Sequence, residues 1–365
     1  MKKIIIAGMR SGAGKTTVTS ALMRSFLSRG LNVAPFKTGP DYIDPGFHRF
    51  VTGKPSHNLD SWMLDGESVR YIFQKNSGGS DIAVIEGAMG LYDGCGTGDE
   101  GSTAHVARIT GAPVILVADA GGVSRSMAAA VNGFCSFDES INITGIIFNR
   151  VSGDSHYRLL KKIIEENCSI RCFGYIPSDP EIVLESRHLG LIPVEEIQGL
   201  SDKIDRMACL VSKYVDIEGL LESLPDSHHS NDTPGFIKEV EGAGTGLKIA
   251  VAMDRAFSFY YSENISLMKH AGIEIVEFSP LRDKRLPDCI DGVYLGGGYP
   301  EVFASELSAN SGMLEDIRGR CMDYMPVYAE CGGLIYLSSG VIDRDGRLSP
   351  FVDFFNSRTV MTVRL

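Results

Sequence analysis

The amino terminus of this chain runs from a short apolar stretch directly into a glycine-rich loop. Residues 3–8 read Lys-Ile-Ile-Ile-Ala-Gly, and residues 9–17 continue Met-Arg-Ser-Gly-Ala-Gly-Lys-Thr-Thr. An apolar run followed at once by glycines and by Gly-Lys-Thr predicts a buried strand that turns sharply into a helix. Backbone amides in such a turn can face a polyphosphate at the helix amino terminus. This feature predicts a nucleotide-binding α/β fold for the first part of the chain.

The spacing inside the loop departs from the usual pattern, which would place a glycine at position 9. Met9 stands there, and the leading glycine is Gly8. Lys15 can still reach the terminal phosphates, and the Thr16 hydroxyl can reach a magnesium ion. The alternative is a glycine-rich turn without a ligand, but Gly-Lys-Thr-Thr after an apolar strand favours nucleotide binding. The candidate ATP-binding residues are Gly12, Ala13, Gly14, Lys15, Thr16 and Thr17.

Carboxylates for a metal ion are expected at the ends of neighbouring strands. Glu86 ends the apolar run 82–85, and ligands of open α/β sheets gather at the carboxyl ends of strands. Asp41 and Asp44, within Lys37-Thr-Gly-Pro-Asp-Tyr-Ile-Asp, are two further candidates. Asp44 is equally consistent with a helix cap or a solvated loop residue. We therefore expect Mg²⁺ to be held by Thr16, Asp41 and Glu86.

Apolar runs and helical stretches alternate along the first 222 residues, which predicts a parallel sheet covered by helices. The expected strands are 4–7, 33–36, 82–85, 114–118 and 143–148. Residues 223–246 are rich in turn formers and polar side chains and are expected to be a linker. A second α/β unit is expected over 247–365, with strands at 247–252, 273–278 and 292–295 and a helix at 263–270. The chain is thus expected to have two domains and a linker.

Composition excludes several classes of protein. A net charge of −11 and a pI near 5.3 argue against a nucleic-acid surface, which would be rich in Lys and Arg. No apolar run approaches the length of a membrane span, and the amino terminus lacks the pattern of a signal peptide. Eight scattered cysteines form no CxxC pair, so reduced thiols of a cytoplasmic enzyme are expected.

Residues 328–333, Tyr-Ala-Glu-Cys-Gly-Gly, predict a strand that enters a sharp turn presenting Cys331 as a nucleophile. A buried structural cysteine is the alternative, because cysteine is often buried. The base that activates such a cysteine is usually a histidine. All eight histidines lie at or before His270, so none follows Cys331.

Several stretches together resemble the cobyrinate a,c-diamide synthase family over nearly the whole chain. They include Lys37 to Asp44, Asn58-Leu59-Asp60 and Glu86-Gly-Ala-Met-Gly-Leu-Tyr-Asp-Gly94, followed by Asn149-Arg-Val and Glu185-Ser-Arg-His-Leu-Gly-Leu191. The family and the related dethiobiotin synthetase also tolerate the shifted loop glycine. Closely similar enzymes amidate nickel-sirohydrochlorin or hydrogenobyrinate, and the motifs do not separate these substrates.

The resemblance implies an ATP-dependent ligase that converts a tetrapyrrole carboxylate into an acyl phosphate, which ammonia then attacks. Lys15 and Mg²⁺ would neutralise charge on the transferring phosphoryl group, with Lys37 close enough to assist. Asn149 would hydrogen-bond adenine, the alternative being a cap at the strand end. The residues implied to face the corrin or related tetrapyrrole are Tyr42, Asp44, Tyr92 and Asp93. The alternative is an ordinary turn, in which aromatic residues beside glycine are also common.

The second unit resembles a class I glutamine amidotransferase, which supplies ammonia from glutamine. Cys331 would be its nucleophile, and the oxyanion hole would use Gly297, Gly298 and Gly332. The family's histidine beyond the elbow has no counterpart here, and His270 precedes Cys331. The 119 residues from 247 to 365 are fewer than the roughly 150 of a usual domain. We therefore expect a carboxyl-terminally incomplete amidotransferase domain, with free ammonia or a separate glutaminase as the alternative source.

Two other classes stay open from the sequence. A partition-type ATPase shares the loop and the sheet, but it would typically carry an amphipathic membrane-binding tail, which is not evident. It would also have no need for a second α/β unit with a cysteine elbow. A silent remnant that only binds nucleotide is the other alternative, because an unfinished sheet leaves an exposed edge. The oligomeric state stays open, with a homodimer as one alternative.

Overall fold

The computed structural model describes residues 1–187, 190–191, 194, 197–227 and 233–362. The chain divides into two compact units, Met1–Pro234 and Gly235–Leu365. The division falls inside the segment expected as a linker, of which residues 228–232 lie outside the described residues.

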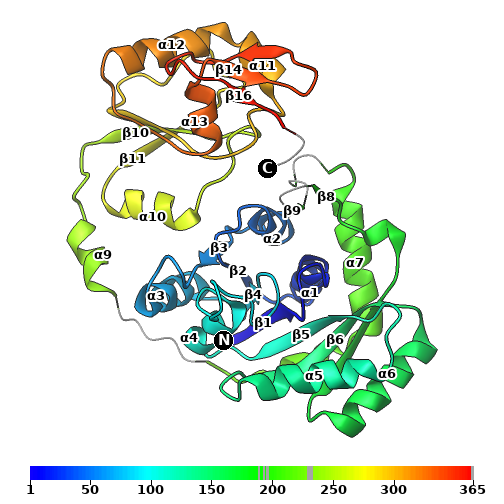
Figure 1. The fold of residues 1–365 in the computed structure, drawn as a ribbon. Helices are drawn as coiled ribbons and strands as arrows, with labels where there is room; N and C mark the ends of the chain where they lie inside the picture. The colour runs from blue at the N-terminus through cyan, green and yellow to red at the C-terminus, as the bar shows by residue number, and fades with distance from the viewer. Residues whose placement is uncertain (188–189, 192–193, 195–196, 228–232, 363–365) are drawn as a thin grey trace. The chain divides into compact units, whose positions relative to one another are not determined.

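The first unit is built on a seven-stranded sheet in which all neighbouring strands run parallel (Figure 1). Strand β1 lies in the middle, between β4 and β5, and its carboxyl end leads into the glycine-rich loop. In spatial order the strands are β3 (His57–Leu59), β2 (Val33–Thr38), β4 (Ile82–Glu86), β1 (Lys2–Gly8), β5 (Val114–Asp119), β6 (Ile143–Val151) and β7 (Arg171–Pro177).

Helices cover both faces of this sheet, because alternate side chains of each strand point to opposite faces. In β1, Ile4 and Ile6 belong to one fully buried cluster, and Ile5 belongs to the other. The first cluster packs under α1 (Lys15–Ser28), α2 (Asp44–Thr52), α7 (Leu200–Tyr214) and α8 (Ile217–Ser223). The second packs under α3 (Gly66–Ser77), α4 (Thr103–Thr110), α5 (Ser126–Phe137) and α6 (Asp154–Asn167).

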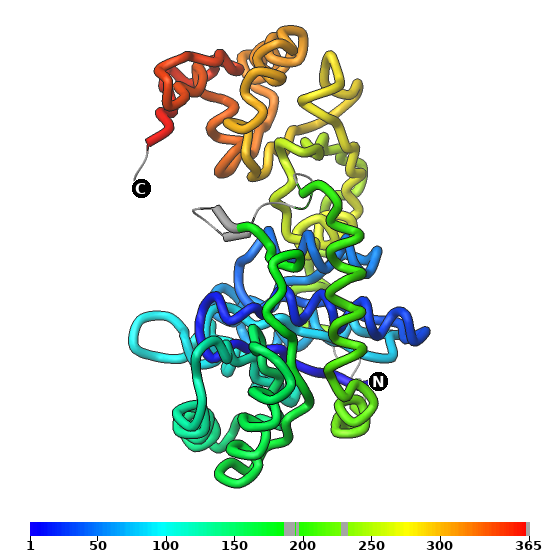
Figure 2. The backbone as a smooth tube through the Cα atoms, turned by 90° about the vertical axis from the view of Figure 1, so that its right-hand side faces the viewer, coloured from blue at the N-terminus to red at the C-terminus, as the bar shows by residue number. Residues whose placement is uncertain are grey.

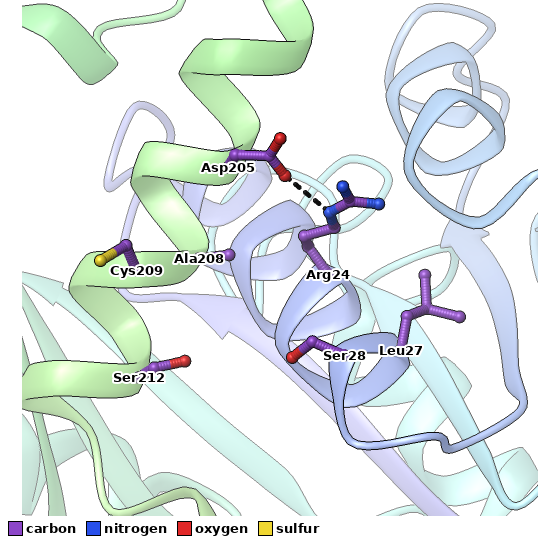
Figure 3. A pocket seen from close by; sticks show the side chains of 7 residues that line it. All are labelled: Arg24, Leu27, Ser28, Asp205, Ala208, Cys209 and Ser212. Atoms are coloured by element: carbon purple, nitrogen blue, oxygen red, sulfur yellow. Dashed lines mark hydrogen bonds and ion pairs between the residues drawn. The ribbon is translucent and has the colours of Figure 1, made fainter.

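Small elements complete the first unit. They are η1 (Pro180–Ile182) and the antiparallel pair β8 (Ser186–Arg187) and β9 (Gly190–Leu191). Helices α1 and α7 pack against each other and are traced in dark blue and green in Figure 2. Between them lies a shallow groove crossed by an ion pair of 2.7 Å from Arg24 Nε to Asp205 Oδ1 (Figure 3). This groove is lined by the carboxyl-terminal half of α1, so it is not the site at the glycine-rich loop.

The second unit has a four-stranded parallel sheet in the order β11 (Glu274–Phe278), β10 (Lys248–Ala252), β12 (Gly292–Leu295) and β13 (Val327–Ala329). A three-stranded sheet follows in the order β15 (Leu348–Pro350), β14 (Gly340–Ile342) and β16 (Thr359–Val360). The helices are α9 (Gly235–Val240), α10 (Ser262–His270), α11 (Ala304–Ala309), α12 (Ser311–Met322) and α13 (Gly332–Leu337).

The expected fold class is confirmed, since each strand expected from the apolar runs lies in a parallel sheet. The segment expected as a linker contains some structure of its own. Helix α9 lies within it, and Ser227 N donates to Met1 O at 2.8 Å. Among the described residues, no helix has both the length and the apolar character needed to cross a bilayer.

Candidate functional site

The glycine-rich loop closes around the amino terminus of α1. Gly12 and Gly14 have φ values of 72° and 95°, in the left-handed region that favours glycine. Gly14 precedes the first helical residue, Lys15, whose side chain is 8% exposed. Lys15 Nζ donates to the Met89 carbonyl at 2.5 Å. Burial, followed by the charge of Lys37, lowers the pKa of Lys15 below its ordinary value.

Asn149 at the end of β6 is tied to this loop. It is 5% exposed, its Nδ2 donates to the Ala13 carbonyl at 3.0 Å, and its Oδ1 accepts from Arg150 N at 2.9 Å. A Cβ atom added at Gly14 would lie 2.0 Å from Asn149 Nδ2. The position of β6 therefore fixes the backbone that precedes Lys15.

We expect Gly14→Ala to weaken ATP binding by at least about 100-fold, because the new methyl group displaces Asn149 and the loop with it. Binding of a fluorescent ATP analogue measures this loss. Gly30→Ala is the matched control, because Gly30 has φ 79° at the other end of α1 with no atom near its added Cβ. It carries the same strain, about 1–2 kcal/mol, without the collision. Equal affinity in the two variants would contradict the prediction.

A buried group of charged side chains lies beside the loop, and we call Thr16, Lys37, Asp44 and Glu86 the Lys37 cluster. Lys37 Nζ hydrogen bonds to Asp44 Oδ2, to Glu86 Oε1 at 3.2 Å and to the Gly87 carbonyl at 3.1 Å. The Thr16 hydroxyl donates to Glu86 Oε1 at 2.7 Å and lies 3.4 Å from Asp44 Oδ1. The register that pairs Lys37 with Glu86 across β2 and β4 brings these residues together.

The charges in the cluster are set by burial and by each other. Burial disfavours charge on Lys37, but Asp44 and Glu86 outweigh it and raise the pKa of Lys37 above its ordinary value. Burial likewise opposes ionisation of Glu86, yet Lys37 and a hydrogen bond from His48 hold its pKa well below its ordinary value. Burial, with Glu86 as a like charge, raises the pKa of Asp44 despite Lys37. Glu86 is therefore the firmly ionised acid of the cluster.

His48 is a member of this site that the sequence did not reveal. Its ring is fully buried, with Nε2 2.7 Å from Glu86 Oε2 and Nδ1 2.9 Å from Ser56 Oγ. His48 follows Asp44 by four residues, so both lie on one face of α2. That spacing was the available signal. With both ring nitrogens engaged, His48 holds Glu86 in one orientation.

The other expected acids and tyrosines are less closely gathered. Asp41 Oδ1 accepts from Ile43 N and Asp44 N at the start of α2, and its Oδ2 lies 3.8 Å from Lys37 Nζ. Tyr42 is half-buried in the same loop. Asp93 is exposed and accepts from Gly90 N at 2.8 Å.

Tyr92 is occupied elsewhere. Its hydroxyl donates to the Phe134 carbonyl of α5 at 2.7 Å, and its ring lies 4.9 Å from that of Phe137. Neither the hydroxyl nor the ring of Tyr92 is therefore part of the Lys37 cluster.

In the second unit, Cys331 lies between β13 and α13. Its side chain is exposed, and its backbone has φ 48° and ψ −114°, a strained conformation for a residue with a side chain. Such a strand-to-helix turn presents a nucleophile at its tip. The sequence prediction of a sharp turn at Cys331 agrees with this geometry. Within the described part of this unit, His270 contacts the Ile237 carbonyl at 3.2 Å rather than Cys331.

The glycines expected around Cys331 are close to it. Strands β12 and β13 pair Leu295 with Ala329, which brings the loop after β12 beside the elbow. A Cβ atom added at Gly297 would lie 3.4 Å from Cys331 Cβ, and one added at Gly332 would lie 2.8 Å from the Gly298 carbonyl oxygen. At Gly298 an added Cβ would lie 2.1 Å from the Ala256 carbonyl oxygen, so Gly298 and Gly332 have no room for a side chain, while Gly297 is only tightly packed.

Similarity to known proteins covers both units. The family model described as the CobQ/CobB/MinD/ParA nucleotide binding domain matches residues 4–192, and that of the CobB/CobQ-like glutamine amidotransferase domain matches residues 248–365. The cobyrinate a,c-diamide synthase of Caldanaerobacter subterraneus subsp. tengcongensis is 44% identical over 99% of this chain and 79% of its own length. That of Listeria innocua is 43% identical over 100% of this chain and 80% of its own length.

The chain belongs to the cobyrinate a,c-diamide synthase family. Members of this family are glutamine-dependent ligases, and the nucleotide-binding and amidotransferase domains are both present in this chain. Part of the family stretch from Glu185 to Leu191, at positions 188 and 189, lies outside the described residues. Among solved structures, the chloroplast FtsY of Physcomitrella patens aligns with 56% of this chain and 65% of its own at 17% identity and a TM-score of 0.37.

Proposed function

We propose that this chain amidates the a- and c-acetate carboxylates of cobyrinate in cobalamin biosynthesis, with ATP as the energy source and glutamine or ammonia as the nitrogen donor. Residues 1–222 would form the synthetase domain and residues 247–365 the amidotransferase domain, joined by 223–246. The observation that carries the proposal is the convergence of Lys15, Lys37 and Glu86 beyond the glycine-rich loop, in a chain related over its whole length to cobyrinate a,c-diamide synthases.

The first step moves the terminal phosphoryl group of ATP. A carboxylate oxygen of the substrate attacks the γ-phosphorus, and the bond from that phosphorus to the β,γ-bridging oxygen breaks. ADP leaves with the electron pair, and an acyl phosphate forms. Lys15 and Lys37 are two cations beside the loop, and they stabilise the charge that spreads over the transferring oxygens. The Ala13 and Gly14 amides and Thr17 are assigned to the phosphates, and Asn149 to adenine.

The hydroxyl of Thr16 and the carboxylates of Asp44 and Glu86 are hard oxygen donors gathered within hydrogen-bonding distance, which is the donor chemistry that Mg²⁺ takes beside phosphates. Among the described residues, no group of three His, Cys, Asp or Glu is by itself arranged as a metal site. The residues therefore fit an ion that takes its remaining ligands from ATP and water. Thr16 and Glu86 would hold it with Asp41 or Asp44, and the ion supplies charge neutralisation.

The second step uses ammonia. With glutamine as donor, the thiolate of Cys331 would attack the carboxamide carbon, the carbon–nitrogen bond would break as the nitrogen takes a proton from solvent, and ammonia would leave. Water would then hydrolyse the thioester to glutamate and return the thiol. The backbone amides of Gly297, Gly298 and Gly332 would stabilise the developing oxyanion. Ammonia then attacks the acyl phosphate carbon, the carbon–oxygen bond to phosphate breaks, and phosphate leaves with the electron pair. The amide nitrogen loses its extra proton to solvent.

ATP-dependent amidation of cobyrinate, followed by mass spectrometry with glutamine or ammonium chloride as donor, tests the proposal. A mass decrease of one unit at each converted carboxylate is expected, together with stoichiometric release of ADP. Failure with both donors, in a folded protein that binds ATP, would refute cobyrinate as the substrate. Nickel-sirohydrochlorin in the same assay then tests the closest alternative.

We expect His48→Ala to raise the free Mg²⁺ concentration for half-maximal ATP turnover by about 10- to 100-fold, because Glu86 loses the group that orients it. His48→Gln, which keeps a donor, should recover part of this loss. His156→Gln is the control, since His156 contacts the Val123 carbonyl outside the cluster. Calorimetric titration of the ATP-bound protein with Mn²⁺ gives a second readout, and an unchanged metal affinity would contradict the prediction.

A further inference from the structure

The single tryptophan of this chain lies in the open. Trp62 is 60% exposed and Met63 beside it is 51% exposed. Apolar side chains of this size are normally buried, so two adjacent exposed ones need an explanation. Their place in the fold supplies one, because they follow β3 at the carboxyl edge of the sheet, where ligands of parallel sheets bind.

The turn that carries Trp62 is held firmly. Asp60, 3% exposed, accepts from the amides of Trp62 and Met63 at 2.9 and 3.1 Å, and its carbonyl accepts from Leu64 N at 3.1 Å. The loop after β4 packs on the other side, where a Cβ added at Gly101 would lie 3.0 Å from Trp62 Cβ. The indole ring is therefore exposed on a fixed support.

A third exposed apolar side chain borders the phosphate site itself. Met89 is 50% exposed, and its carbonyl accepts the hydrogen bond from Lys15. It follows β4, and Trp62 follows β3, with β2 between them. Neighbouring strands are about 5 Å apart, so the two loops begin about 10 Å from each other. Between them, the loop after β2 carries Asp41 and Asp44.

We infer that Trp62, Met63 and Met89 form a platform on which the tetrapyrrole macrocycle rests while one of its carboxylates reaches Lys15 and Lys37. This inference rests on the proposed function and names the part of the site that recognises the ring. A flat conjugated ring can stack on an indole and on thioether side chains without a large free-energy cost of desolvating polar groups. The carboxylates at the ring's periphery are the groups that two buried ammonium groups attract.

The nucleotide base is a poor alternative occupant of this platform. Asn149, assigned to adenine, lies near the carboxyl end of β6, and Trp62 follows β3. These strands lie on opposite sides of β1, whose end carries the phosphate loop. If ATP extends from the loop toward β6, the carboxyl ends of β4, β2 and β3 stay accessible to the tetrapyrrole.

Trp62→Ala is the test, because a side chain that is more than half exposed can be removed without unfolding the protein. We expect the KM for cobyrinate to rise about 10- to 100-fold, with kcat at saturation changed less than about threefold and the KM for ATP unchanged. Trp62→Phe should keep most of the affinity. Leu159→Ala, which removes a 48% exposed side chain from α6 beside β6 and β7, at the opposite edge of the sheet from β3, should change nothing.

The same residue also reports binding in the wild-type protein. Trp62 is the sole indole, so cobyrinate added without ATP should quench the tryptophan emission saturably, and ATP alone should leave it unchanged. An unchanged KM for cobyrinate in Trp62→Ala, or a raised KM for ATP in its place, would overturn the platform. Saturable quenching by cobyrinate without any amidation would refute the proposed function and retain the platform. If neither cobyrinate nor nickel-sirohydrochlorin gives quenching or turnover, both the proposed function and the platform are refuted.

Discussion

Replacing Lys37 with methionine is expected to reduce ATP-dependent amidation by about 100- to 1000-fold, whichever nitrogen donor is supplied. The 2% exposed ammonium group of Lys37 is the cation between Asp44 and Glu86. Without it, two buried carboxylates face each other, and neither phosphate nor substrate carboxylate meets a second positive charge beside Lys15. The initial rate of ADP release with cobyrinate and ammonium chloride measures the loss.

The same substitution should destabilise the first unit by about 3–5 kcal/mol, because it leaves buried charge without a partner. Lys37→Met/Asp44→Asn removes one of the two carboxylates and should recover part of the stability in urea unfolding, without recovering activity. Lys162→Met is the surface control, since Lys162 is 73% exposed in its pair with Glu166 and such pairs contribute little. Near-normal activity of the folded double variant would contradict the assignment of Lys37 to catalysis.

Cys331→Ala is expected to abolish glutamine-dependent amidation, by at least about 1000-fold, and to leave the ammonium-dependent reaction within about twofold of the wild-type rate. Only the nucleophile of the second unit is removed, whereas the Lys37 cluster belongs to the first. Cys289→Ala is a close control, because Cys289 is also exposed, lies in the same unit and has a φ of 55°. Parallel product assays with the two donors decide the prediction.

The backbone conformation of Cys331 leads to a separate prediction about the free energy of unfolding. At φ 48° a residue without a Cβ is relieved of strain, so Cys331→Gly should unfold at a higher urea concentration than Cys331→Ala, by about 1 kcal/mol. Equal stabilities would mean that the turn stores no strain. A glutamine-dependent rate that survives in either variant would show that another group acts as the nucleophile.

The sequence predicted the sheet well because its strands are buried on both faces and so appear as continuous apolar runs. Runs 4–7, 82–85 and 114–118 are of this kind, and each is a strand of the central sheet. Strand β3, of three residues, was missed because His57 and Asn58 are polar and the run is short. Its omission mattered, since β3 positions Asp60 and Trp62.

The sequence identified the motifs of the site one by one, but it did not predict which of their side chains contact each other. Lys15, Thr16 and Glu86 were named from the glycine loop and from the end of a strand. The hydrogen bond between His48 and Glu86 joins residues 38 positions apart; the spacing of Asp44 and His48 places both on one face of α2 but does not indicate that this face meets Glu86. The family resemblance implied a substrate contact for Tyr92, and the structure adds that its ring packs on Phe137 and its hydroxyl donates to the Phe134 carbonyl, so the substrate contact stays a prediction. Tertiary packing sets the partners of both His48 and Tyr92.

The central place of β1 has a consequence for how the protein is made. In chain order β1 precedes both of its neighbours in the sheet, which are β4, ending at Glu86, and β5, ending at Asp119. Until residue 119 has been synthesised, Ile4, Ile5 and Ile6 lack one or both of these partner strands, and contacts so distant in sequence form slowly. During synthesis β1 is therefore an apolar strand with unpaired edges, and slower synthesis between β1 and residue 119 should lower the yield of folded protein.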